Sequence, residues 1–410
     1  MDARTRKILQ RIDELARISE EPDQLTRTFG SSAMRRANDL VAQWMNEAGL
    51  KTGTDAIGNV IGRPRATWPG RKTLLLGSHL DTVRNAGKFD GPLGVILAIA
   101  AVEEFSREDL PLPFDVAVIG FADEEGVRYQ TTYLGSGVMA GTFDLKDLER
   151  RDAAGISLRD AIRAFGGDPE NLSSAEWPRT NLIGYLEAHI EQGPVLEENN
   201  LAVGMVTTIS GQSRLQIRFL GRAGHAGTTP MHLRADALCA AAEFILAVEA
   251  RARKTFCLVA TVGRIQVEPG AGNVIPGAAT LTLDVRHQEY SLRVAAVAFL
   301  HRAAREISRR RHVKVEWQLV QQAASVPCSA PLSALLAAAV KKHQPRCLAL
   351  ASGAGHDAAV MTSIAPTAML FIRCKKGLSH HPAESVKPGD VRVALDVMVD
   401  FIRQLAQQHE

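Results

Sequence analysis

The chain has 410 residues, which is too long for one ordinary hydrophobic core and predicts two or three domains. Apolar residues make up 46% of it and charged residues 23%, a composition typical of a globular protein and not of a disordered or fibrous one. The formal net charge of only +3 and the aromatic content of 5% indicate neither a nucleic-acid partner nor a membrane partner.

Cysteine content and the N-terminal segment favour a cytoplasmic protein. The five cysteines are an odd number without a C-x-x-C pair, so we expect neither a disulfide scaffold nor a zinc ribbon. The first twenty residues are densely charged and predict an amphipathic helix, not a signal peptide. The most apolar helical run, residues 93–102, is shorter than the roughly 20 residues that span a bilayer.

The first part of the chain alternates strand and helix patterns. Short apolar runs at 73–80 and 116–122 are typical of strands buried on both faces of a sheet, and 93–105 between them has the length of a helix. Residues 181–188 and 367–372 are further strand candidates. Each strand except the last leads into acidic residues and histidines, and sites in open α/β sheets lie at the carboxyl ends of strands.

A segment with a different pattern interrupts this arrangement. Its elements predict the order β-α-β-β-α-β of a ferredoxin-like unit, with strands and helices in chain order at 214–220, 235–250, 258–267, 278–286, 291–308 and 313–319. We therefore expect an α/β catalytic domain with a mixed sheet flanked by helices at 1–210 and 323–410. A ferredoxin-like α+β dimerisation or lid domain is expected at 211–322.

Histidines and carboxylates at the strand ends suggest a metal centre. This residue set suits divalent ions such as Zn²⁺ or Mn²⁺, and two neighbouring ions need a bridging carboxylate. The candidates are His79, Asp90, Glu125, His189 and His380. Taken singly, each has a structural alternative: a hydrogen-bonded histidine, an Asp-Gly turn, or a solvated acidic loop.

Eight motifs spread over nearly the whole chain support the metal interpretation. In order they are GSHLDT, KFDGPLG, DEEG, HIEQGPVLE, GHAGTTPM, NVIPG, SGAGHDA and SHHPAE. With these motifs in this order, the chain resembles the amidase, hydantoinase and carbamoylase branch of the dinuclear metallopeptidase-like amidohydrolases. The resemblance implies two divalent ions per subunit, Mn or Zn. His79 and His189 would bind one ion, Glu125 and His380 the other, and Asp90 would bridge them.

The same resemblance implies roles for the neighbouring residues. Asp81 is expected to orient a ligand imidazole, and Glu124 to act as the general base. His225 is expected to reach from the inserted domain of a partner subunit to the oxyanion, which implies a homodimer; alternatively, it is a residue of the lid turn. His381 adjoins His380, and the spacing S-H-x-P-A-E selects His380 as the ligand.

The resemblance also implies a small anionic ureido substrate. Arg286 would bind its carboxylate, and Asn273 would form a hydrogen bond beside it. Backbone near Gly353 would line the pocket. Gln192 would contact the ureido group or, alternatively, brace the metal loop. The GQSR segment that ends in Arg214 is similar to allantoate amidohydrolases, whereas N-carbamoyl-L-amino acid hydrolases typically have apolar residues there. The alternative for Arg214 is a solvated surface charge.

We therefore expect hydrolysis of allantoate to ureidoglycine, ammonia and carbon dioxide. An N-carbamoyl-L-amino acid hydrolase with the same metal-water mechanism is the alternative. A peptidase of the wider family and a non-catalytic binding protein with this fold are further possibilities.

Overall fold

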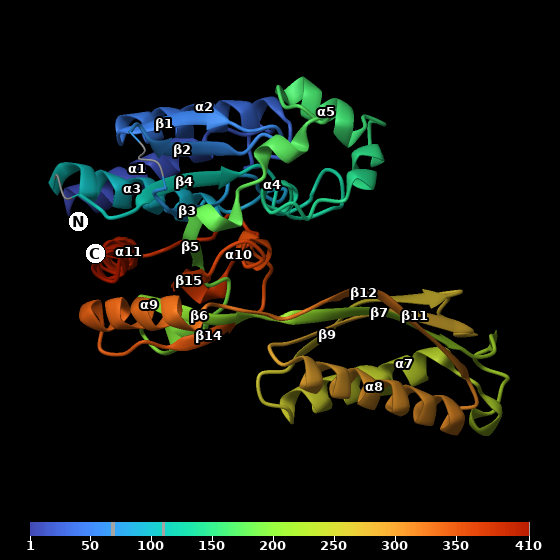
Figure 1. Ribbon diagram of the computed structural model, residues 1–410. Helices are drawn as coiled ribbons and strands as arrows, with labels where there is room; N and C mark the ends of the chain where they lie inside the picture. The colour runs from blue at the N-terminus through green and yellow to red at the C-terminus, as the bar shows by residue number, and fades with distance from the viewer. Residues whose placement is uncertain (67–69, 109–110, 410) are drawn as a thin grey trace. The chain divides into compact units, whose positions relative to one another are not determined.

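The chain divides into two compact units, seen in a computed structural model that describes residues 1–66, 70–108 and 111–409 (Figure 1). Unit 1 comprises Met1–Thr207 and Cys328–Glu410, and unit 2 comprises Thr208–Pro327. The segment expected at 211–322 lies within unit 2. Unit 1 is therefore discontinuous in sequence, with unit 2 inserted into it.

Unit 1 is built on a mixed sheet, as the apolar runs predict. The four central strands β4, β3, β5 and β15 are mutually parallel, and antiparallel strands flank them on both sides. In sheet order the strands are β1 (Leu50–Thr54), β2 (Val60–Pro64), β4 (Asp115–Phe121), β3 (Thr73–His79), β5 (Leu182–Ile190), β15 (Thr367–Ile372), β6 (Val203–Ile209) and β13 (Val326–Pro327), with β14 (Ala349–Ser352) beside β6. The flanking strands, which the sequence analysis does not include, are short or partly exposed, so they lack a continuous apolar run.

Five long helices form the main core with the sheet. They are α1 (Ala3–Ala16), α2 (Ser32–Glu47), α3 (Pro92–Glu108), α9 (Ala330–His343) and α11 (Pro388–Gln407). Helix α3 contacts the strands as well as α1 and α11, so it is apolar on nearly all sides. Shorter elements, including α4 (Leu134–Met139) and α5 (Leu158–Phe165), enclose a second, smaller core. No helix in the described part of the chain is long and apolar enough to cross a membrane.

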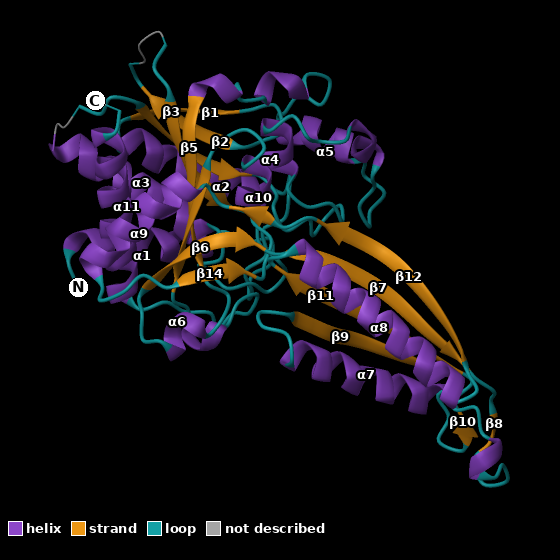
Figure 2. Cartoon of the chain, turned by 60° about the horizontal axis from the view of Figure 1, so that its bottom comes forward, coloured by secondary structure: helices purple, strands orange, loops and turns teal. Residues whose placement is uncertain are grey.

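Unit 2 has the predicted ferredoxin-like fold. Its antiparallel sheet has the order β12-β7-β11-β9, and the helices α7 and α8 pack on one face of it (Figure 2). In chain order the elements are β7 (Gly211–Leu220), α7 (Ala237–Arg253), β9 (Val259–Glu268), β11 (Ala278–His287), α8 (Tyr290–Arg310) and β12 (Lys314–Ala323). Two short strands, β8 (Gly224–His225) and β10 (Val274–Ile275), pair separately. The alternating apolar residues of β7 and β11 face the helices, which leaves the polar residues of both strands on the opposite face.

Candidate metal centre

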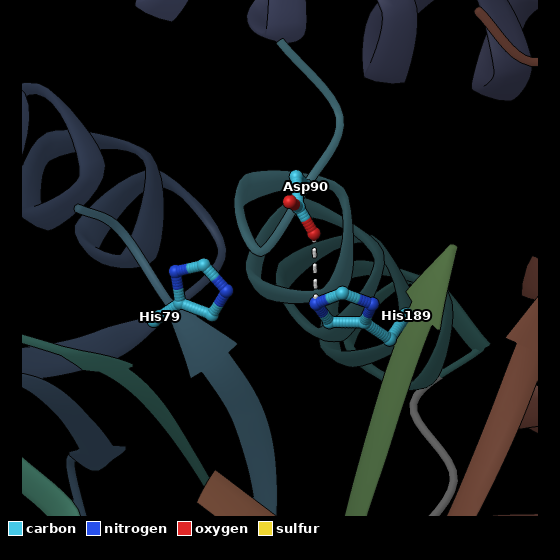
Figure 3. A group of neighbouring side chains, drawn as sticks. All are labelled: His79, Asp90 and His189. Atoms are coloured by element: carbon cyan, nitrogen blue, oxygen red, sulfur yellow. Dashed lines mark ion pairs between the residues drawn. The ribbon is translucent and has the colours of Figure 1, made fainter. Parts of the chain in front are cut away.

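Two histidines and one aspartate form a buried cluster at the carboxyl ends of the parallel strands. His79 is the last residue of β3, His189 lies near the end of β5, and Asp90 lies just before α3 (Figure 3). His189 Nε2 is 3.2 Å from Asp90 Oδ1, and the two imidazole rings have their centroids 5.7 Å apart. Parallel strands end at one edge of the sheet, which explains why residues 110 positions apart meet here.

Asp90 also contacts a second group of candidate ligands. His380 Nε2 lies 3.1 Å from Asp90 Oδ2 and 3.2 Å from Glu125 Oε1. Asp90 therefore turns one carboxylate oxygen toward His189 and the other toward His380. This is the arrangement that a carboxylate between two ions requires.

The spacing and chemistry of these side chains fit divalent metal ions. Two ligand atoms that are each about 2.0–2.2 Å from one ion lie roughly 3–3.5 Å apart, and the observed separations are in this range. In the described residues, potential ligand atoms lie within 4.8 Å of one another in four groups: His79–Asp90–His189, Glu187–His189–His356, His79–Glu124–Glu125 and Asp90–Glu125–His380. Imidazole and carboxylate donors are suitable for Zn²⁺ and Mn²⁺.

Gly91 allows Asp90 to approach His79. Its φ of +81° lies in the left-handed region, and a Cβ at this position would be 2.5 Å from the His79 ring. The Asp90-Gly91 pair is therefore more than a solvent-exposed turn.

The cluster of carboxylates favours positive charge at this place. Burial alone would raise the pKa of Asp90, but the hydrogen bond from His380 and the charges of His189 and His79 hold it well below its usual range. Hydrogen bonds to Asp90 and Glu125 in turn raise the pKa of His380 to about 10. The carboxylates thus attract a cation, whether a protonated imidazole or a metal ion.

Asp81 connects a candidate ligand to the candidate base. Its carboxylate lies 3.3 Å from His79 Nδ1 and accepts the backbone N–H groups of Glu124 and Glu125 at 3.0 and 3.1 Å. Glu124 is buried, and burial raises the pKa of its carboxyl well above the usual range; the negative charge of Glu125 adds to this effect, while His79 opposes it. A carboxyl group with a raised pKa is suited to accept and return a proton.

Gln192 braces the central carboxylate. Its Nε2 donates to both oxygens of Asp90 at 3.2 Å and to Ser379 Oγ at 3.1 Å. Its Oε1 is buried and has no hydrogen-bond partner within the described residues. The amide nitrogen of Gln192 therefore helps to orient the Asp90 carboxylate.

Glu384 holds the Asp90 loop, a contact that the sequence analysis does not identify. Its carboxylate accepts the backbone N–H groups of Phe89 and Asp90 at 2.8 and 3.2 Å. Burial, together with the charge of Asp90, raises its pKa to about 7. The signal in the sequence is the glutamate that ends SHHPAE, four residues after His380.

Two further buried polar residues, His356 and Glu187, lie close to His189. The His356 ring packs 4.5 Å from the His189 ring, and its Nε2 is 2.8 Å from Ser352 Oγ. Glu187, two residues before His189, accepts Ser78 Oγ–H at 2.8 Å. A glutamate inside an otherwise apolar strand is the signal that identifies this group in the sequence.

Unit 2 brings together the two arginines expected to bind the substrate. Arg286 donates to both oxygens of Asp284 at 2.9 Å, and Arg214 Nε donates to the same carboxylate at 3.3 Å. All three side chains lie on the sheet face opposite the helices. Asp284, which the sequence analysis does not include, thus holds two guanidinium groups beside each other.

His225 and Asn273 are neighbours in the pairing of β8 and β10. Val274 pairs with His225, and the Ala226 N–H donates to the Asn273 carbonyl at 2.9 Å. Both residues are exposed. Gly353 follows β14 in unit 1 and is exposed, and a Cβ there would have no heavy atom within 4 Å.

Comparisons with known proteins place these motifs in one family. The sequence profile of peptidase family M20/M25/M40 matches residues 75–404. The N-carbamoyl-L-amino acid amidohydrolase of Geobacillus stearothermophilus is 40% identical over 98% of each chain. Allantoate deiminase 1 of Glycine max is 38% identical over 97% of this chain and 88% of its own. The structure of an amidase of the hydantoinase/carbamoylase family from Burkholderia multivorans superposes with a TM-score of 0.92, at 28% identity over 98% of both chains.

Proposed function

The chain belongs to peptidase family M20/M25/M40 and is an amidohydrolase, and we propose that it hydrolyses allantoate. The observation that carries this substrate is Arg214, which lies beside Arg286 on one face of β7 and β11. Allantoate has one carboxylate and two ureido groups. Two adjacent arginines offer it more than the single carboxylate contact that a carbamoyl amino acid needs.

The metal centre of the proposed enzyme would hold two divalent ions, manganese or zinc. His79 and His189 would hold one ion, Glu125 and His380 would hold the other, and Asp90 would be the ligand that both share. When bound, such ions lower the pKa of water toward neutrality and polarise the ureido carbonyl group. The separations of Asp90 from His189 and His380 support this assignment.

The reaction is the addition of water to one ureido carbonyl carbon, followed by cleavage of the bond to its terminal nitrogen. Glu124 takes a proton from the attacking water and transfers it to the departing nitrogen, which leaves as ammonia. The remaining carbamate loses carbon dioxide and yields ureidoglycine. Asp81 keeps His79 and Glu124 in fixed positions relative to each other during these steps.

The residues of unit 2 are proposed to bind the substrate and the oxyanion. Arg286, Arg214 and Asn273 take the carboxylate end, while Gln192 and the backbone near Gly353 take amide groups. His225 of a partner subunit stabilises the oxyanion, which requires a homodimer formed through unit 2. Exposure of His225 and Asn273 supports contact with a group from outside their own unit.

Hydrolysis of N-carbamoyl-L-amino acids is the second candidate. It is favoured by the 40% identity to the Geobacillus stearothermophilus protein. Both reactions use the same metal centre, so only the substrate-binding residues distinguish them.

The test is ammonia release from manganese-loaded protein offered allantoate and several N-carbamoyl-L-amino acids, with and without chelator. We expect the highest kcat/KM for allantoate and no turnover after chelation. Faster turnover of a carbamoyl amino acid would contradict the allantoate assignment. Metal binding without turnover of any of these substrates, or of dipeptides, would instead indicate a binding protein.

A further inference from the structure

A backbone hydrogen bond joins Tyr133 to the candidate base, Glu124. The N–H of Tyr133 donates to the Glu124 carbonyl at 3.2 Å, and the N–H of Leu134 donates to the Asp123 carbonyl at 2.8 Å. Tyr133 has φ +62° and ψ +35°, a left-handed conformation that a bulky aromatic residue rarely adopts. The loop from Asp123 to Leu134 thus folds back so that Tyr133 lies beside Glu124, and the backbone of Tyr133 is strained in this position.

Two other residues of the candidate metal centre also have a left-handed backbone conformation. Gln192 and His380, which both contact Asp90, have φ values of +55°. Strained residues of this kind persist where the surrounding structure and the function require them. Tyr133 belongs to this set by its conformation and by its contact with the Glu124 segment.

The hydroxyl group of Tyr133 and the carboxylate of Glu124 both lie close to Gly355. A Cβ at Gly355 would lie 1.9 Å from the Tyr133 hydroxyl and 3.7 Å from Glu124 Oε1. The φ of Gly355 is outside the left-handed region, so space, and not backbone conformation, requires a glycine here. Gly355 is exposed, so solvent reaches the place that both side chains approach.

We infer that Tyr133 contacts the substrate, with its hydroxyl group hydrogen-bonding the ureido group and holding the departing nitrogen beside Glu124. This inference rests on the proposed function. A phenol is suited to the task because it donates to a carboxylate and accepts from an amino group at the same time. The residue then favours substrates that end in an unsubstituted ureido group over those with a substituted terminal nitrogen.

The first test is the Tyr133→Phe variant, which removes only the oxygen atom. We expect kcat for the ureido substrate to fall about tenfold, with bound metal and melting temperature unchanged. The matched control is Tyr129→Phe, four residues earlier on the same loop, whose hydroxyl is 3.4 Å from the Ser157 carbonyl oxygen. We expect the control to keep the kcat of the wild type.

The second test uses the steric overlap that a side chain at Gly355 would have with the Tyr133 hydroxyl. The Gly355→Ala variant should lose at least as much kcat as Tyr133→Phe, because its methyl group displaces the hydroxyl. Adding Tyr133→Phe removes the 1.9 Å contact and leaves 3.1 Å to the ring carbon, so the double variant should return to the level of Tyr133→Phe.

Two results would overturn the inference on its own: a Tyr133→Phe variant with the kcat of the wild type, or a double variant as impaired as the product of the two single losses. A wild type that releases no ammonia from any ureido substrate would overturn this inference together with the proposed function.

Discussion

One carboxylate oxygen of Asp81 accepts the backbone N–H of Glu124 at 3.0 Å. The same oxygen lies 3.3 Å from His79 Nδ1. Asp81 therefore fixes the position of a candidate metal ligand and of the candidate base together, although His79 ends β3 and Glu124 follows β4. Any change in its charge is expected to affect metal affinity and proton transfer at once.

The Asp81→Asn variant should weaken metal binding about 10- to 100-fold and lower kcat, since an amide offers one acceptor oxygen where the carboxylate offers two. Titration with Mn²⁺ followed by calorimetry measures the first effect. The control is Asp115→Asn, which should bind metal normally. Asp115 is the first residue of β4, at the end of the strand away from Glu124, and forms an ion pair with Arg71. Equal metal affinity in Asp81→Asn and wild type would refute the positioning role.

The Glu124→Gln variant should lose about 10²- to 10⁴-fold in kcat, because an amide cannot accept the proton from water. Elemental analysis should find the metal content of the wild type. If Glu124→Gln loses metal, Glu124 is a ligand and its role as the base is wrong.

Removal of metal should destabilise unit 1. At a free metal concentration of 100 times Kd, binding contributes about 2.7 kcal/mol to the free energy of unfolding, so chelation should lower the melting temperature. The Asp90→Asn variant should melt at the same temperature with and without chelator, since it lacks the carboxylate that faces both groups of ligands. A chelator-sensitive Asp90→Asn protein would contradict the bridging role.

The Arg214→Leu variant should shift substrate preference toward N-carbamoyl-L-amino acids. Loss of one charge-assisted hydrogen bond should lower kcat/KM for allantoate about 10- to 100-fold and leave kcat/KM for the carbamoyl substrate nearly unchanged. Arg218→Leu serves as the control, because Arg218 lies on the same face of β7 but is near Glu268 and Glu316. A parallel loss on both substrates would mean that Arg214 does not discriminate between them.

Asp284 should make the stability of unit 2 dependent on pH. Burial raises its pKa, but the hydrogen bonds and charge of Arg286 and the hydrogen bonds from Gln212 and Arg214 lower it more, so the folded pKa lies below the unfolded value. The ionised carboxylate therefore stabilises the fold above about pH 4, and this contribution disappears as pH falls through the folded pKa. Its size is about 1 to 2 kcal/mol.

Hydrogen exchange of β7 and β11 peptides measures this effect in unit 2 alone. Asp284→Asn should exchange faster than the wild type at pH 7, and the difference should shrink as pH falls below 4. A constant difference across this range would contradict the electrostatic explanation.

Much of the fold was predictable because it depends on local pattern. Strands buried on both faces require continuous apolar runs, and the predicted strand at 73–80 corresponds to β3 (Thr73–His79). Strands with one buried face require apolar and polar residues to alternate, as they do in β7 and β11. The edge strand β1 and its neighbour β2 were not predictable in this way, since each has only five residues and is partly exposed.

The sequence by itself determined the α/β class, the inserted ferredoxin-like unit and the residue types of a candidate metal centre, because these follow from periodicity and from which residues end each strand. Only the tertiary structure decided that Asp90 faces His189 with one oxygen and His380 with the other. It also decided that Asp284 accepts hydrogen bonds from two arginines, and that the side chains of Tyr133 and Glu124 both lie close to Gly355. These contacts join residues distant in the chain, and their geometry depends on strand order and side-chain direction, which local pattern does not encode.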